Sequence, residues 1–141
     1  MGNLIWPILV VVAANTFYNI CAKSTPGGVQ PFASLTITYL VAAALSLFMF
    51  FVTSESKNII TEVQKTNWTA IAFGCAIVGL EFGNINMYRV GWKVSTGSLV
   101  ANIGLACVLL IVGIAAYKES LSAKQIIGMI LCVSGILLIS K

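Results

Sequence analysis

Five apolar stretches, each about as long as a membrane crossing, constrain this chain more than any other feature of its sequence. They occupy approximately residues 4–22, 31–51, 68–90, 96–117 and 123–140. A helix needs about 20 apolar residues to cross the hydrocarbon layer, so 141 residues leave little room for anything else. Only 9% of the residues are charged, against roughly 25% in a soluble domain. The sequence therefore predicts an all-α polytopic membrane protein, with five transmembrane helices in a single domain over residues 1–141.

The composition argues against several classes of function. The net charge of +4 is spread along the chain without a basic cluster, so we expect no nucleic acid partner. The chain has no histidine, and its four cysteines are widely spaced in apolar stretches. Buried cysteines of this kind are usually packing residues. We therefore expect no metal and no cofactor, and no nucleophile–base pair indicates an enzyme. The amino terminus lacks the basic region of a cleaved signal peptide.

Two features of the connecting segments give local predictions. Residues 53–67 form the only long polar stretch, and Ile59, Ile60 and Val63 recur in it at helical spacing. This pattern predicts a short helix on the membrane surface. Ser95 precedes the fourth apolar stretch and is a candidate N-cap for its helix.

The third apolar stretch carries a carboxylate near its middle, Glu81. A charged side chain at the bilayer centre costs about 2.5–3.5 kcal/mol on insertion scales, so such groups usually face a protein interior or a wet cavity. Polar residues follow Glu81 at helical spacing and would share its face, with Arg89 on the border. The members of this stripe are Glu81, Asn84, Tyr88 and Trp92. We expect the other helices to shelter it.

Three further residues join the predicted solute site. Asn15 and Asn19 lie four apart in the first stretch and so share a helix face. Tyr39 is the polar residue of the second stretch that we expect near a cavity. The complete predicted substrate-binding set is Asn15, Asn19, Tyr39, Glu81, Asn84, Tyr88, Arg89 and Trp92. The asparagines and tyrosines would offer neutral hydrogen bonds, Trp92 a stacking surface, and Arg89 a contact for an anionic group.

Glu81 also has a structural interpretation, as one member of an ion pair with Arg89 or Lys93. Eight residues separate Glu81 from Arg89, which is about 12 Å of rise along one helix. A pair within one helix is therefore stretched, whereas a pair between two subunits is not. Both the solute-site and the ion-pair interpretation stay open at this point.

The distribution of basic residues does not orient the chain in the membrane. With five crossings, Lys57, Lys65, Lys118 and Lys124 lie on the same side as the amino terminus, and Lys23, Arg89, Lys93 and Lys141 lie on the other. Cytoplasmic loops normally hold an excess of Lys and Arg, and here that excess is absent. The hypothesis that follows is insertion in both orientations, with pairing as an antiparallel homodimer. Two inverted copies would rebuild the inverted repeat that many transporters carry in one chain.

The end and the beginning of the chain resemble a known family. Residues 117–122, YKESLS, followed by 125–140, QIIGMILCVSGILLIS, resemble the end of an EamA-type domain of the drug/metabolite transporter superfamily. Residues 18–23, YNICAK, followed by a Gly-rich turn and Pro31, resemble the opening of such a domain. Most members have ten helices in two inverted five-helix halves. The resemblance therefore implies an EamA-like bundle that corresponds to one half.

The chain is also similar to the four-helix small multidrug resistance proteins, through Thr96-Gly97 and the segment from Gly128 to Gly135. Those proteins act as antiparallel dimers with a carboxylate in the first helix. When the sequences are aligned on Lys23, Asn15 stands where that carboxylate would be. Their mechanism therefore does not carry over. If a carboxylate couples transport here, it is Glu81.

The combined expectation is a secondary transporter of small metabolites or amphipathic solutes in the cell (inner) membrane. It would work by alternating access, with proton coupling through Glu81, because two carboxyls that approach each other in a dimer away from water favour the protonated form. The alternative is a membrane subunit without transport activity of its own, or half of a lipid-linked-sugar flippase that needs a paralogous partner. A stable homodimer would favour the first, and a requirement for another protein the second.

Overall fold

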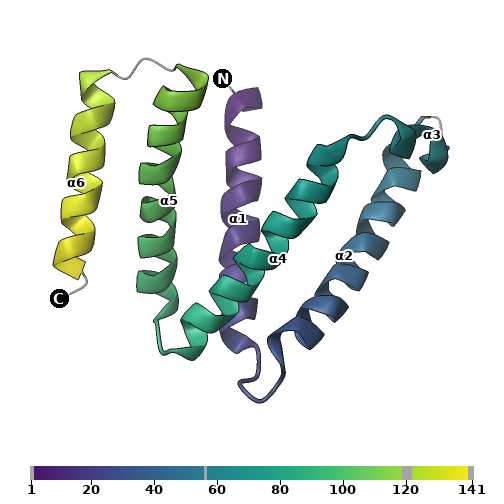
Figure 1. Cartoon of the computed structure of the whole chain (residues 1–141), viewed down its shortest axis with the longest axis horizontal. Coiled ribbons are helices and arrows are strands. Elements are labelled where there is room, and N and C mark those ends of the chain that lie inside the picture. The colour runs from purple at the N-terminus through teal and green to yellow at the C-terminus, as the bar shows by residue number, and fades with distance from the viewer. Residues whose placement is uncertain (1, 56, 119–121, 140–141) are drawn as a thin grey trace. The chain divides into compact units, whose positions relative to one another are not determined.

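The computed structural model describes residues 2–55, 57–118 and 122–139, in which helices are present and strands are absent. The helices are α1 (Gly2–Ser24), α2 (Pro31–Thr53), α3 (Ile59–Gln64), α4 (Trp68–Arg89), α5 (Val94–Tyr117) and α6 (Ala123–Ile139), labelled in Figure 1. They form two compact units, Met1–Arg89 and Val90–Lys141. The first unit contains α1 to α4, and the second contains α5 and α6.

The all-α prediction is confirmed for the described residues, and the five long helices follow the predicted ranges within a few residues. Four of them are long and apolar enough to cross a membrane: α1, α2, α4 and α5. Helix α6 has 17 residues, which is about 26 Å of helix against a hydrocarbon layer of about 30 Å. The fifth crossing therefore stays a prediction. Of the closing motif, residues 119–121 and 140 lie outside the described residues, as does Lys141.

The short helix predicted in the polar linker is confirmed as α3. The side chain of Asn58 caps it and accepts a hydrogen bond from the Thr61 backbone N–H at 3.4 Å. At the other end of the helix, the ammonium of the C-cap residue Lys65 pairs with Glu62 at 2.6 Å. Ser95, the N-cap predicted for the helix that is now α5, is wrong. Lys93 has the extended backbone of an N-cap and its carbonyl accepts from Gly97 N–H at 2.8 Å, so Ser95 falls inside the first turn.

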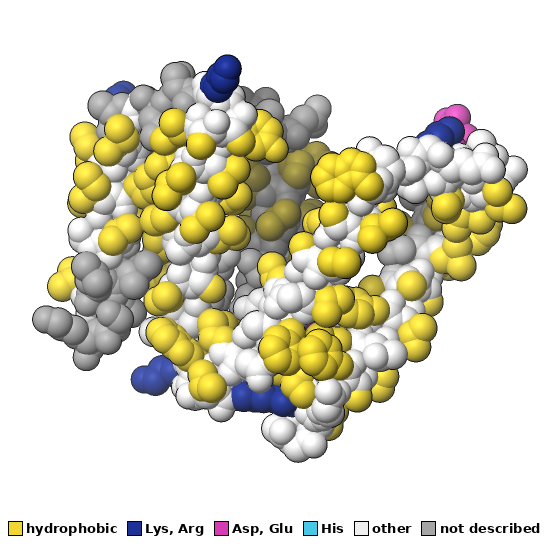
Figure 2. Space-filling model, in the orientation of Figure 1, with side chains coloured by type: hydrophobic (Ala, Val, Ile, Leu, Met, Phe, Trp, Pro, Cys, Tyr) yellow, Lys and Arg dark blue, Asp and Glu magenta, His cyan; other side chains and the backbone are white. Residues whose placement is uncertain are grey.

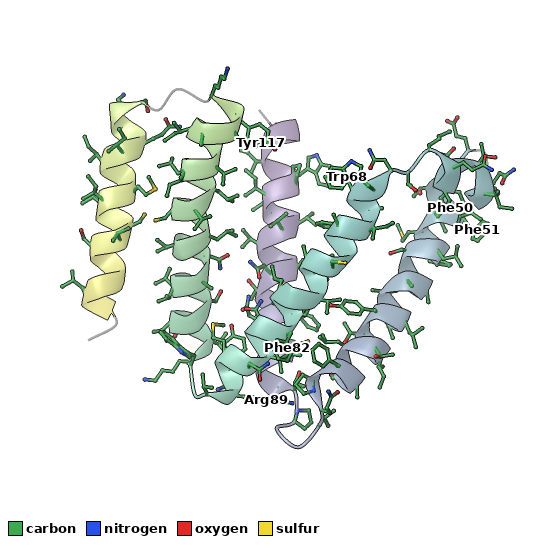
Figure 3. All side chains as sticks on the ribbon, viewed as in Figure 1. Phe50, Phe51, Trp68, Phe82, Arg89 and Tyr117 are labelled. Carbon is green, nitrogen blue, oxygen red and sulfur yellow. The ribbon has the colours of Figure 1, made fainter. Side chains whose placement is uncertain are left out.

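In the first unit, α4 packs against both α1 and α2. The rings of Phe32 on α2 and Phe82 on α4 stack at a centroid distance of 4.8 Å, with planes 4° apart. At the end of α4, Arg89 reaches the α1–α2 turn (Figure 3) and its Nη2 donates to the carbonyls of Pro26 and Val29 at 3.1 and 2.5 Å. The Pro26 carbonyl also accepts from the Val29 N–H within the turn at 3.2 Å, and the two bonds from Arg89 tie this turn to α4.

A polar contact joins α1 to α4 inside this unit. The Tyr88 hydroxyl donates to Asn19 Oδ1 at 2.5 Å, and both residues are buried. The Asn19 amide in turn donates to Asn15 Oδ1 at 2.8 Å, which confirms that the two asparagines share a face of α1. Hydrogen bonds of this kind hold helices together in membranes, where water does not compete for the groups.

The apolar core of the described residues is thin. Its buried hydrophobic side chains are Ala22, Leu35, Ile85 and Tyr88. In the second unit, α5 packs on α6, and the buried residues of α5 are the glycines Gly97 and Gly113. Small residues let membrane helices approach closely. Large apolar side chains instead cover the outside of the helices, and basic side chains lie near helix ends, as Figure 2 shows for one face. This is the surface expected of helices that contact lipid.

We expect Tyr88→Phe to weaken the first unit by about 0.6–1.7 kcal/mol, the range measured for hydrogen bonds between membrane helices. The substitution keeps the ring but leaves Asn19 Oδ1 without its donor. Reversible unfolding in mixed detergent micelles measures the difference. Tyr117→Phe is the matched control, because Tyr117 is 75% exposed. Equal stability of the two variants would contradict the assigned role of Tyr88.

Candidate functional site

Three helices of the first unit bring polar groups towards Glu81 of α4. The Tyr18 hydroxyl of α1 lies close enough to interact with both the Glu81 carboxyl and the Asn84 side chain. The Tyr39 hydroxyl of α2 lies within electrostatic reach of the same carboxyl. Glu81 itself is half-buried. We name the four residues Tyr18, Tyr39, Glu81 and Asn84 the carboxylate cluster.

The two tyrosine hydroxyls of the carboxylate cluster are buried, and neither makes a hydrogen bond of full geometry with a described group, although the Tyr18 hydroxyl is close enough to Glu81 and Asn84 to interact with both. A hydroxyl buried without a partner costs about 1–3 kcal/mol. Each can donate one hydrogen bond and accept another. The Asn84 amide is partly used, because its Nδ2 donates to Leu80 O at 2.9 Å. The cluster therefore has spare hydrogen-bonding capacity beside a carboxylate, in a part of the chain that is otherwise apolar.

The predicted face of α4 is present, and it points towards α1. Glu81 and Asn84 interact with Tyr18, and Tyr88, one turn beyond Asn84 on α4, donates to Asn19, the next residue of α1. Ile85, on the same face, is buried. The stripe read from the sequence thus describes the side of α4 that packs inside the unit.

Tyr88, Asn19 and Asn15 form a short chain of hydrogen bonds. Tyr88 donates to Asn19, and Asn19 donates to both the side chain and the backbone carbonyl of Asn15. These bonds link the side chains of α1 and α4 to one another, so the structure gives them a packing role. A contact of any of them with solute stays a prediction.

Arg89 does not form an ion pair with Glu81 in the described part of the chain, since its guanidinium is bound to the carbonyls of the α1–α2 turn. The interpretation of Glu81 as an ion pair with Arg89 in the same helix is therefore not supported. Lys93 lies beyond the end of α4, in the other unit. A pair between subunits stays an open alternative.

The helical position inferred for Trp92 is wrong. Helix α4 ends at Arg89, and Gly91 has a φ of +103°, a left-handed conformation that glycine adopts readily. The chain therefore leaves the helix before Trp92, which belongs to the second unit. Its predicted place in the stripe depended on continued helical rotation.

Sequence reasoning did not include Tyr18 in the site, although a signal was present. Asn15, Tyr18 and Asn19 follow the spacing i, i+3, i+4, which puts all three on one face of a helix. The structure makes Tyr18 the residue of α1 that faces Glu81.

The comparisons with known proteins agree with this all-helical architecture. The model of the EamA-like transporter family matches residues 4–141, nearly the whole chain. Searches of curated proteins and of solved structures find no match. With four helices able to span a membrane, this is a multi-pass membrane protein of a family of transporters. The chain belongs to the EamA-like transporter family, part of the drug/metabolite transporter superfamily.

Proposed function

We propose that the protein is a secondary transporter that moves a small metabolite or amphipathic solute by alternating access, with proton coupling at Glu81. One observation carries the proposal: among the described residues, a carboxylate in a spanning helix lies near two buried tyrosine hydroxyls, and neither hydroxyl makes a hydrogen bond of full geometry, although that of Tyr18 is close enough to interact with the carboxylate. A purely structural carboxylate would be expected to have those donors, or a cation, bound to it. A solute that supplies the missing partners fits the site better.

The coupling follows from the cost of a charge away from water. When the carboxylate cluster is closed to both sides, Glu81 is stable either as the neutral acid or against a donor group of the solute. Proton and solute would then replace each other on the same carboxyl. The hydroxyls of Tyr18 and Tyr39 orient towards whichever is bound, because each both donates and accepts.

The contacts of α4 suggest where the conformational change takes place. The Asn19–Tyr88 bond and the Arg89 contacts with the turn lie at the C-terminal end of α4. This end would act as the fixed point, while the remainder of α4 tilts relative to α1 and α2. Tilting of one helix group against another about a bound site is the usual form of alternating access.

We further propose an antiparallel homodimer in the cell (inner) membrane. The thin core of one chain and the half-exposed side chain of Glu81 favour a partner that completes the solute chamber. Inverted pairing agrees with the equal division of basic residues, and it would supply the second five-helix half of a typical superfamily member. The alternative is a heteromer, as a subunit or as half of a lipid-linked-sugar flippase. The thin core of one chain agrees equally with a paralogous partner chain that packs against it.

Glu81→Gln is expected to abolish proton coupling, because the amide keeps the shape of the side chain but does not bind a proton. Proteoliposomes that contain a trapped pH indicator report proton movement when amino acids, organic cations or amphipathic drugs are added outside. The wild type should respond to at least one class, and Glu81→Gln should fall to the background of empty liposomes. Glu62→Gln is the control, since Glu62 belongs to the short helix α3. Full transport with unchanged pH dependence in Glu81→Gln would refute the coupling.

The oligomeric state separates the two proposed assemblies. Purified alone in a mild detergent, the chain should behave as a stable dimer in light scattering with refractive-index correction for the detergent. The reason is that a second copy would cover the part of Glu81 that one chain leaves exposed. A monomer, or a chain that is recovered only together with another protein, would favour the heteromer.

Dual topology predicts that a reporter fused to the C-terminus is found on both sides of the membrane in one population of cells. Paired reporters, one active only in the cytoplasm and one only outside it, should both give a signal of similar size. Adding two lysines to the α1–α2 turn should shift the signals in opposite directions, because basic residues are retained in the cytoplasm. A signal from one side only in the unmodified chain would exclude dual topology.

A further inference from the structure

The charges around the carboxylate cluster indicate which class of solute it takes. Among the described residues Glu81 has no cation beside it, since the guanidinium of Arg89 is bound to the α1–α2 turn. A carboxylate away from water is stable as the neutral acid or against a positive charge. If proton and solute replace each other on Glu81, as proposed above, the solute must bring that positive charge. In this respect the solute class depends on the proposed function.

The uncharged polar groups of the cluster can accept hydrogen bonds. The hydroxyls of Tyr18 and Tyr39 are buried, and neither makes a hydrogen bond of full geometry with a described group. Asn84 donates its Nδ2 to Leu80 O at 2.9 Å, which leaves its Oδ1 as an acceptor. An ionised carboxylate accepts hydrogen bonds and donates none. A positive group that enters the cluster therefore meets acceptors from α1, α2 and α4.

An ammonium ion with N–H groups matches this set of acceptors. A primary ammonium has three N–H donors on one charged nitrogen, so it can bond to the carboxylate and to both hydroxyls. A quaternary ammonium has the same charge but no N–H donor, and with it the buried hydroxyls would stay without partners, which is costly. A site built on hydrogen bonds discriminates strongly against an analogue that lacks the bonding group. An anion would be repelled by Glu81.

The hydroxyls also have a structural interpretation, in which they hold the Glu81 side chain in place. Tyr18 fits this interpretation, because it interacts with both Glu81 and Asn84. Tyr39 does not, because its buried hydroxyl lies only within electrostatic reach of the carboxyl. We propose that the carboxylate cluster takes an organic ammonium ion with N–H donors, in preference to a quaternary ammonium ion or an anion. On binding, the N–H groups bond to the Glu81 carboxylate and the two hydroxyls, and the carboxyl proton is released to water.

The test is isothermal titration calorimetry of the purified full-length protein in neutral detergent. The probes share a hexyl chain and differ in the head group: hexylammonium, trimethylhexylammonium, hexanol and hexanoate. We expect hexylammonium to bind about tenfold more tightly than trimethylhexylammonium, as for one hydrogen bond to a charged group. Hexanol and hexanoate should bind more weakly than either cation. Titrations in two buffers that differ in ionisation enthalpy should show proton release with hexylammonium, and Glu81→Gln should lose that release.

A matched pair of tyrosine variants tests the role of the hydroxyls. Tyr39→Phe should bring the affinities for the two cations closer together, because it removes an acceptor that hexylammonium alone can use. Tyr117→Phe, at a tyrosine that is 75% exposed on α5, should keep the wild-type preference. The readout is a ratio of two affinities within one variant, so a partial loss of folded protein does not change it.

The outcome is separate from that for the proposed function. Transport that depends on Glu81 but uses a quaternary ion or an anion would contradict the ammonium site and leave the transporter in place. Ammonium binding as expected, without transport in proteoliposomes, would do the reverse. Equal affinity for the two cations, tighter binding of hexanoate, or no binding of hexylammonium would overturn the proposal. An unchanged preference in Tyr39→Phe would also overturn it.

Discussion

The constraint on which the structure depends is the free-energy cost of a carboxylate in a helix that spans the membrane. Glu81 has no cation beside it in the described chain, and the groups that face it are neutral. Its charge is therefore tolerable only when water, a solute or a proton reaches it. The arrangement of α1, α2 and α4 follows from this requirement, because each of the three supplies part of the polar surroundings of Glu81.

A polar contact joins α1 to α4, whereas stacked phenyl rings join α2 to α4. In water, burial of apolar surface would supply most of the stability, but lipid tails are as apolar as leucine and remove that advantage. The Asn19–Tyr88 bond and the contacts of Arg89 with the α1–α2 turn act in its place. They lie at one end of α4, so the middle of the helix remains free to serve a site. Because few large side chains are buried between the helices, the thin core is also compatible with the helix tilting that the proposed alternating access requires.

The sequence alone predicted the class, the long helices and the face of α4 that points inward, because length and helical periodicity determine these. It did not predict which residue of α1 faces Glu81 on α4. Tyr18 was missed because its role depends on how α1 rotates against α4, which no local pattern specifies. Trp92 was misplaced because helical phase was extended past Gly91, where the chain turns. For Arg89, proximity in sequence suggested Glu81, whereas the nearest acceptors in space are carbonyls of a turn some 60 residues earlier.

The central claim is that Glu81 is reachable and protonated in a chamber that solute enters. Dicyclohexylcarbodiimide, an apolar reagent that reacts with protonated carboxyls, tests this directly when the modified residue is located by mass spectrometry of the reconstituted protein. The account predicts a single adduct at Glu81, lost at alkaline pH and reduced by any solute that the protein transports. Modification confined to Glu55 or Glu62, or labelling of Glu81 that neither pH nor solute changes, would contradict it.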